Sequence, residues 1–203
     1  PRAVPDAFRE RYGLTPTERY VLFVGSEDPR KNLATLLRAF ALVRRERSDV
    51  RLLKVGAAHH LAERGRLRRL AADLGIERQV RWIDHVPEAD LPLFYNAAAL
   101  CVMPSLYEGF GLPAVEAMAC GTPVICSDAA SLPEVVGEAA VVVPAHATDA
   151  FAQAMLCLLN DQAMADRLAS RGLARAASLT WDRSVQSVAA VYERVLTNGG
   201  GSA

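Results

Sequence analysis

The sequence has little lysine and no excess charge of either sign. Lysine and arginine together number 23, as do aspartate and glutamate, so the formal net charge at pH 7 is zero. Lys31 and Lys54 are the only lysines, and we interpret this bias as compositional rather than functional. Nucleic-acid-binding proteins normally carry a clear basic excess, so we expect no nucleic-acid partner.

Several common site motifs are also missing. The cysteines form no Cys-x-x-Cys pair and the four histidines are scattered, so no metal centre is predicted. We expect buried, reduced thiols at Cys101, Cys120, Cys126 and Cys157. The absence of Gly-x-Gly-x-x-Gly argues against a dinucleotide oxidoreductase. The absence of Asp-x-Asp likewise predicts no site for a divalent metal.

No apolar run approaches the roughly 18 residues that a membrane-spanning helix needs, and we find no signal-peptide pattern. We therefore expect a cytoplasmic location. One predicted helix is crowded with Arg64, Arg66, Arg68 and Arg69. We favour a solvated outer helix face for these arginines, and contact with a membrane surface is the alternative.

Short apolar or β-branched runs alternate with segments of helical periodicity. The predicted strands are Tyr20–Val24, Val50–Val55, Gln79–Ile83, Ala99–Met103, Pro123–Ser127 and Ala140–Val143. The helices expected between them include Leu33–Arg45, Leu61–Leu74 and Ala89–Ala98. Strands that are apolar throughout indicate a parallel sheet covered on both faces. The predicted fold class is therefore α/β, a doubly wound, Rossmann-like parallel sheet of six strands.

The ends of the chain differ from this pattern. Residues 1–19 are predicted to be a lead-in segment with a short helix, and residues 20–197 to be one Rossmann-like domain. Three helices follow the last strand, at Ala147–Asn160, Gln162–Ser178 and Trp181–Leu196. We expect these extra C-terminal helices to pack on the sheet edge or to reach toward a part of the protein outside it. Residues 198–203 are predicted to be a flexible tail.

Ligands of open parallel sheets bind beyond the carboxyl ends of the strands. The loop Gly25–Asn32 lies there, and it places Arg30 and Lys31 beside a predicted helix N-terminus. A helix N-terminus favours anions through its free N–H groups and its dipole. The functional interpretation is a diphosphate site, and the alternative is a pair of solvated surface cations.

The segment Pro104–Pro123 carries the most restrictive pattern in the chain. Two glycines, Gly109 and Gly111, allow the backbone to approach a ligand closely. Glu108 lies in the loop and Glu116 on the helix that follows, with seven residues between them. One carboxylate can therefore face each end of a ligand. The alternative is a solvated loop acid and a charge that stabilises the helix N-terminus.

Pro104–Pro123, with its E-x7-E glutamates, resembles the signature of the family-4, or group 1, retaining glycosyltransferases of the GT-B fold. Val24-Gly25 followed by Pro29–Asn32 is similar to the phosphate loop of that family. Ser131–Ala140 is similar to its segment after the fifth strand, and Thr180-Trp181 to the start of its last helix. The likeness covers nearly the whole chain, from about Tyr20 to Leu196.

The resemblance implies that the chain is the donor-binding half of a two-domain glycosyltransferase that uses a nucleoside-diphosphate sugar and no other cofactor. It assigns Glu116 to the ribose, Glu108 to the donor sugar and Lys31 to the diphosphate. Glu108 and Lys31 are the expected catalytic residues. The expected donor-binding residues are Gly25, Ser26, Arg30, Lys31, Ile83, His85, Val86, Glu108, Gly109, Phe110, Gly111, Leu112 and Glu116.

Two departures from the family pattern bear on function. Many members place arginine where this chain has Ser26, and either Arg30 compensates or phosphate binding rests on Lys31. The acceptor-binding N-terminal domain has no counterpart here, so we expect donor binding without transfer by this chain alone, whether it is an excised domain or half of a split enzyme.

The form of the phosphate loop favours GDP-mannose as the donor. The alternatives are a non-catalytic nucleotide-sugar-binding module and a retaining glycoside hydrolase, which also uses two carboxylates.

Overall fold

The computed structural model describes residues 2–58 and 61–199, and six parallel strands form its single sheet. The strands are β1 (Arg19–Val24), β2 (Val50–Val55), β3 (Val80–Ile83), β4 (Leu100–Met103), β5 (Val124–Ser127) and β6 (Ala140–Val143), in the order β3-β2-β1-β4-β5-β6. Every neighbouring pair is parallel. The predicted doubly wound, Rossmann-like fold is confirmed.

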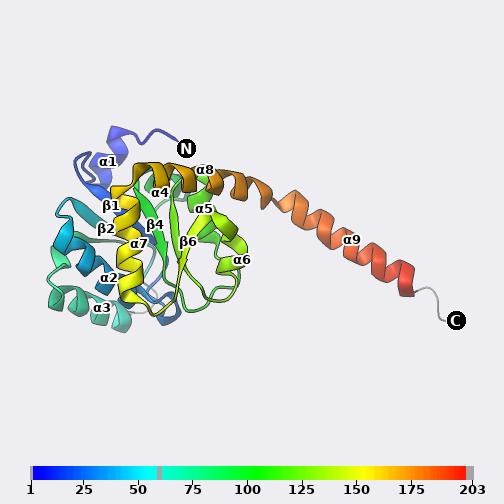
Figure 1. Ribbon diagram of the computed structural model, residues 1–203, viewed down its shortest axis with the longest axis horizontal. Helices are drawn as coiled ribbons and strands as arrows, with labels where there is room; N and C mark the ends of the chain where they lie inside the picture. The colour runs from blue at the N-terminus through cyan, green and yellow to red at the C-terminus, as the bar shows by residue number, and fades with distance from the viewer. Residues whose placement is uncertain (1, 59–60, 200–203) are drawn as a thin grey trace.

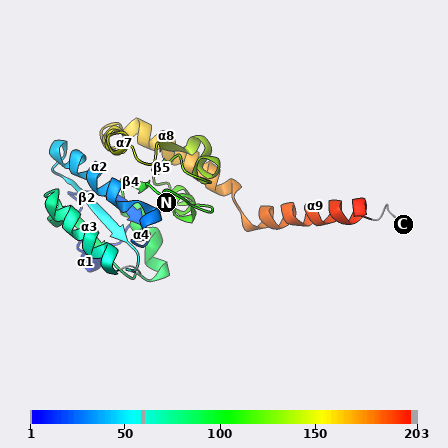
Figure 2. The same ribbon diagram turned by 90° about the horizontal axis from the view of Figure 1, so that it is seen from below.

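Helices cover both faces of the sheet (Figures 1 and 2). They are α1 (Asp6–Tyr12), α2 (Leu33–Glu46), α3 (Leu61–Asp73), α4 (Leu91–Ala97), α5 (Leu112–Ala119), α6 (Leu132–Val136), α7 (Thr148–Asn160), α8 (Gln162–Ser178) and α9 (Trp181–Gly199). Four short 3-10 segments lie at Pro29–Lys31, Glu77–Gln79, Glu88–Asp90 and Gly137–Ala139. The sequence patterns did not predict α6 or these short segments as separate elements.

The alternation of side chains along each strand creates two hydrophobic cores. In β1, Val21 and Phe23 point into a core shared with α2 and α7, whereas Tyr20 and Leu22 point into a core shared with α4 and α5. Successive side chains of a strand face opposite sides of a sheet, so a strand buried on both sides is expected to be apolar at most of its positions. The two cores hold the strand ends rigidly, and the candidate site lies beyond those ends.

The lead-in segment packs on the body of the domain. The ring of Phe8 lies 4.9 Å from that of Tyr12 and 4.9 Å from that of Phe94, measured between centroids. Tyr12 and Phe94 complete the cluster at 4.6 Å. Aromatic contacts of this kind fix α1 against α4.

The C-terminal helices differ in how they pack on the rest of the domain. Helix α7 packs on α2, and α8 packs on α5. Helix α9, in contrast, extends away from the body in both views (Figures 1 and 2). It exposes Trp181 (85% exposed) and an apolar stripe that includes Val185, Val188 and Tyr192. The predicted tail overlaps the end of α9, and its last four residues lie outside the described part of the chain.

The expectation of four buried thiols is wrong in part. All four cysteines are free, and Cys101 and Cys126 are buried, but Cys120 is half-buried and Cys157 is exposed. Cys157 lies on the outer side of α7, where helical periodicity places one residue in solvent between buried neighbours. Within the described ranges, no helix is long and apolar enough to cross a membrane.

Candidate donor-binding site

The loop after β1 and the loop after β4 are held together by hydrogen bonds. The backbone N–H of Leu106 donates to the carbonyl of Arg30 at 2.7 Å. The side chain of Asn32 donates to the carbonyls of Pro104 and Ala145, both at 2.9 Å. Asn32 has a φ of 54°, a left-handed conformation that asparagine tolerates better than most residues. These bonds bring the two loops that carry the sequence motifs to the same edge of the sheet.

Glu108 lies at the centre of this junction. Lys31 Nζ donates to its Oε1 at 2.7 Å, and Ser105 Oγ donates to the same oxygen at 2.7 Å. The guanidinium of Arg30 approaches Oε2 at 3.6 Å. The side chain of Glu108 is only 6% exposed. The structure therefore brings the adjacent cations Arg30 and Lys31 to Glu108, which lies 77 positions beyond Lys31 in the chain.

Helix α5 begins at this junction with free donors. Within the described chain, the backbone N–H groups of Gly109–Leu112 form no hydrogen bonds. Gly111 has a φ of 93°, and a Cβ there would lie 2.6 Å from Leu132, so only glycine fits. Ser131 Oγ donates to the carbonyl of Glu108 at 2.9 Å and fixes the loop from the other side. Free N–H groups at a helix N-terminus form a binding site for anions.

Glu116 lies one to two turns into α5 and is half-buried. The hydroxyl of Tyr95 donates to Glu116 Oε2 at 2.7 Å. Burial raises the pKa of the Tyr95 hydroxyl well above its usual range, so this group stays a donor at any physiological pH. One carboxylate oxygen is thus fixed by the protein, which orients the group for a ligand at its exposed side.

The loop Ile83–Val86, which the family resemblance assigns to the base of the nucleotide, lies two strands away, after β3. The backbone joins them to the phosphate loop: Gly25 N–H donates to Val55, and Gly56 N–H donates to Ile83. A Cβ on Gly56 would lie 2.5 Å from the carbonyl oxygen of Gly25, so glycine permits this close approach. Ile83 and Val86 are half-buried and His85 is exposed.

Ser26, the residue that departs from the family pattern, does not reach the cluster around Glu108. It is half-buried, and its hydroxyl accepts a hydrogen bond from the backbone N–H of Asp28 at 3.4 Å. Asp28 in turn accepts from the N–H and the Nε of Arg30, at 2.9 and 3.0 Å. Ser26 therefore shapes the turn that carries the two cations.

A second set of charges lies beneath the loops. Lys54 Nζ is 2.5 Å from Glu27 Oε1, and Arg64 contacts both Glu27 and Asp84. The interpretation of Arg64 as part of a solvated outer face is therefore wrong, because its helix turns this side chain toward Glu27. Arg66, Arg68 and Arg69 do face solvent.

Sequence reasoning missed several residues that position the site, namely Glu27, Lys54, Tyr95, Ser105 and Ser131. One of them had a usable signal. Lys54 stands in a strand whose other fully buried positions are all apolar, and a buried lysine needs an anion nearby. The serines lay within the quoted motifs, but nothing in the linear order indicated which carboxylate they contact.

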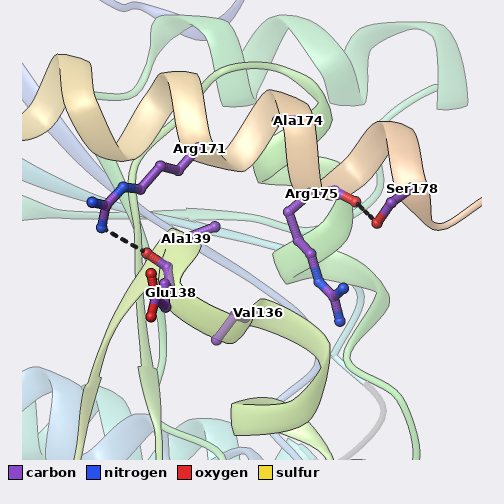
Figure 3. A pocket seen from close by; sticks show the side chains of 7 residues that line it. All are labelled: Val136, Glu138, Ala139, Arg171, Ala174, Arg175 and Ser178. Atoms are coloured by element: carbon purple, nitrogen blue, oxygen red, sulfur yellow. Dashed lines mark hydrogen bonds between the residues drawn. The ribbon is translucent and has the colours of Figure 1, made fainter.

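A surface pocket elsewhere does not overlap this site. It lies between α8 and the segment 136–139 (Figure 3), and its lining includes Arg171 and Arg175. Both guanidiniums donate to backbone carbonyls, Arg171 to Glu138 and Arg175 to Glu134 and Val135. None of the predicted donor-binding residues lines this pocket, and its arginines serve to join α8 to α6.

Comparisons with known proteins agree with this geometry. The family model described as glycosyl transferases group 1 matches residues 5–175. The O-antigen chain mannosyltransferase B of Escherichia coli is 38% identical over 174 residues, which is 86% of this chain and 45% of that protein. The structure of a sucrose-phosphate synthase from Thermosynechococcus elongatus superposes with a TM-score of 0.82 and 33% identity, over 96% of this chain and 49% of that one.

A third comparison concerns the extent of the domain. The C-terminal domain of a group 1 glycosyltransferase from Francisella tularensis covers 88% of this chain and 93% of its own length, with a TM-score of 0.77. At 22% identity this likeness shows the fold alone. The chain spans about half the length of the curated relatives it matches. With its six-stranded parallel sheet and its match to the family model, the chain belongs to the group 1 glycosyltransferases and corresponds to their C-terminal, Rossmann-like domain.

Proposed function

We propose that this chain binds a nucleoside-diphosphate sugar as the donor domain of a glycosyltransferase. The observation that supports this most directly is the junction of two loops, where Lys31, Arg30 and Glu108 meet the free N–H groups at the start of α5. Two cations and a helix N-terminus at one sheet edge suit a diphosphate. The carboxylate of Glu108, which is paired with Lys31, can accept hydrogen bonds from the hydroxyl groups of a sugar.

The proposed chemistry places positive charge where the leaving group becomes negative. Cleavage of the bond from sugar to phosphate leaves a nucleoside diphosphate, and its growing charge is stabilised by donors that are already in place. Lys31, Arg30 and the N–H groups of Gly109–Leu112 supply these donors. Glu108 faces the sugar, and Glu116 holds the ribose hydroxyls. We propose that no divalent metal is needed, because the cations of the protein take its place.

Further parts of the proposal concern the sugar that is transferred, the acceptor and the location of the protein. We propose transfer of a hexose with retention, onto a glycan, lipid-linked or small-molecule acceptor held by an N-terminal domain. We propose GDP-mannose as the donor, and the name of the 38% identical relative, a mannosyltransferase, supports mannose as the sugar. We also propose that the full-length protein works in the cytoplasm; peripheral contact with the inner face of the cytoplasmic membrane is the alternative.

The second candidate is a nucleotide-sugar-binding module without catalysis, because this chain offers the donor side of a cleft only. A turnover assay separates the two. The 203-residue chain and a two-domain version, completed with the N-terminal half of the E. coli relative, are incubated with GDP-mannose and an acceptor. The proposal predicts nucleotide release coupled to transfer by the two-domain protein alone. A two-domain protein that binds the donor without turnover would support the module instead.

A further inference from the structure

Four charged side chains, three of them buried, form a cluster at the phosphate loop, the segment Gly25–Asn32. Lys54 Nζ lies 2.5 Å from Glu27 Oε1, and Arg64 Nη2 reaches the same oxygen at 2.5 Å. Arg64 Nη1 pairs with Asp84. The side chains of Lys54 and Glu27 are fully buried, and that of Arg64 is 11% exposed. The cluster therefore joins β2, α3 and the loops after β1 and β3.

Stability alone does not explain such a cluster. Removing ions from water is costly, and apolar side chains of similar volume often stabilise a core equally well. Glu27 Oε2 is buried and accepts no hydrogen bond within the described ranges, which adds to the cost. A costly arrangement next to a binding site points to a role in shaping that site.

Among the described residues, Arg64 alone pairs with acids from both loops. Its Nε and Nη2 donate to Glu27 in the phosphate loop, at 2.9 and 2.5 Å. Its Nη1 pairs with Asp84, which follows β3 at the start of the base loop, residues 84–86. A guanidinium is a rigid planar fork, so it holds two carboxylates at a fixed separation. The ring of Trp82, 5.8 Å from Arg64 Cζ, flanks the guanidinium.

We propose that Arg64 is a positioning residue that sets the spacing between the phosphate loop and the base loop, and so couples recognition of the two ends of a nucleotide. The inference rests on the proposed function, since it requires a nucleoside diphosphate that spans both loops. A site with fixed loops loses less conformational entropy when the ligand binds. Releasing one loop therefore weakens the binding of a ligand that spans both loops. The affinity for a ligand that contacts only the phosphate loop should not change.

The test compares two kinds of ligand on the 203-residue chain. UDP, GDP and ADP are each titrated by calorimetry, and inorganic diphosphate serves as the ligand of the phosphate loop alone. Asp84→Asn cuts the bridge at its exposed end, where the side chain is 59% exposed, so the fold is retained. We expect nucleoside diphosphate binding to weaken by about threefold to tenfold, and diphosphate binding to change by less than about twofold. Asp84→Glu, which keeps the charge, should restore most of the loss.

Arg64→Met completes a double-mutant cycle with Asp84→Asn. If the two residues act through one bridge, the double variant binds no more weakly than Arg64→Met alone. The matched control is Arg68→Met, which removes a neighbouring arginine that also lies over Trp82, at 5.6 Å. This control should bind like the wild type.

The outcomes separate this inference from the proposed function. A wild-type chain that binds none of the three nucleotides overturns both. A wild-type chain that binds one of them, with Asp84→Asn unchanged, overturns the inference alone. Additive losses in the double variant would also overturn it, because they indicate two independent contacts. If Arg64→Met fails to fold, Asp84→Asn and its rescue by glutamate decide the question.

Discussion

The ammonium of Lys31 lies 2.7 Å from Oε1 of Glu108, although 77 residues separate them in the chain. Their side chains are 14% and 6% exposed, so solvent and salt screen the attraction only in part. The cation that suits a diphosphate is thus held by a carboxylate when no ligand is bound. A diphosphate that binds here must compete with Glu108 for Lys31, and this competition has measurable consequences.

Lys31→Ala should weaken binding of a nucleoside diphosphate by about tenfold to a hundredfold. The estimate follows from a charge-assisted hydrogen bond, which contributes about 1.5–3 kcal/mol. Calorimetry on the diphosphate and on the bare nucleoside provides the comparison. The nucleoside, which lacks phosphates, should bind the variant and the wild type alike. Equal losses for both ligands would mean that the substitution damages the fold and that no phosphate contact is missing.

Glu108→Gln should leave nucleoside diphosphate binding unchanged or make it tighter by up to about tenfold. The substitution removes a negative charge from the site and frees Lys31, while the amide oxygen can still accept from Ser105. The rate of sugar transfer by a two-domain enzyme should nevertheless fall, because the donor sugar no longer has the Glu108 carboxylate to contact. Titrations at low and high salt check the electrostatic origin, since any gain should shrink as salt rises. A tenfold loss of nucleotide affinity would contradict this account.

Glu116→Gln should weaken nucleoside diphosphate binding by about 1–2 kcal/mol, because both oxygens of a carboxylate accept hydrogen bonds from hydroxyls, whereas one end of an amide only donates. Tyr95→Phe removes the donor that orients Glu116, and its effect should be smaller, about 0.5–1.5 kcal/mol. Circular dichroism verifies the fold of both variants. If Tyr95→Phe weakens binding while Glu116→Gln does not, the assignment of Glu116 to the ribose is wrong.

Thiol labelling should depend on burial and on pKa. Burial raises the pKa of Cys126 to about 12, and it raises the pKa of Cys101 further. Below such a pKa the thiol stays protonated, and the thiolate is the reactive form. Iodoacetamide at pH 8 should therefore modify the exposed Cys157 first and leave Cys101 and Cys126 intact, as mass spectrometry can show. All four should react once the chain is unfolded in guanidinium. Rapid labelling of Cys126 in the native protein would contradict the packing of β5.

The sequence predicted the sheet well because the strands are buried on both faces of the sheet and most of their positions are apolar. Strand ends agree with the structure to within one residue, as in Val50–Val55, which was predicted with the observed bounds. Helix α6 was missed because its five residues, Leu132–Val136, are too few to show a helical period.

The site could be predicted only as two separate loops. The motifs indicated two sets of candidate residues, but the bond from Lys31 to Glu108 depends on how the ends of β1 and β4 meet. The same applies to Tyr95 and Glu116, which lie on different helices. Arg64 was misread because a charged helix face is usually solvated, and the two acids that bind it, Glu27 and Asp84, come from loops outside its helix. Pairings of this kind are set by the tertiary structure and leave no trace in local spacing.

The central claim is that this sheet edge binds a nucleoside diphosphate through the protein's own cations. The direct test is calorimetric titration of the wild-type chain and Lys31→Ala with UDP, GDP and ADP, first with excess chelator and then with magnesium. The account predicts saturable one-to-one binding of at least one nucleotide, with a gain below about tenfold on adding metal and a clear loss in Lys31→Ala. Saturable binding by none of the three, or binding that appears only with magnesium and is unchanged in Lys31→Ala, would contradict it.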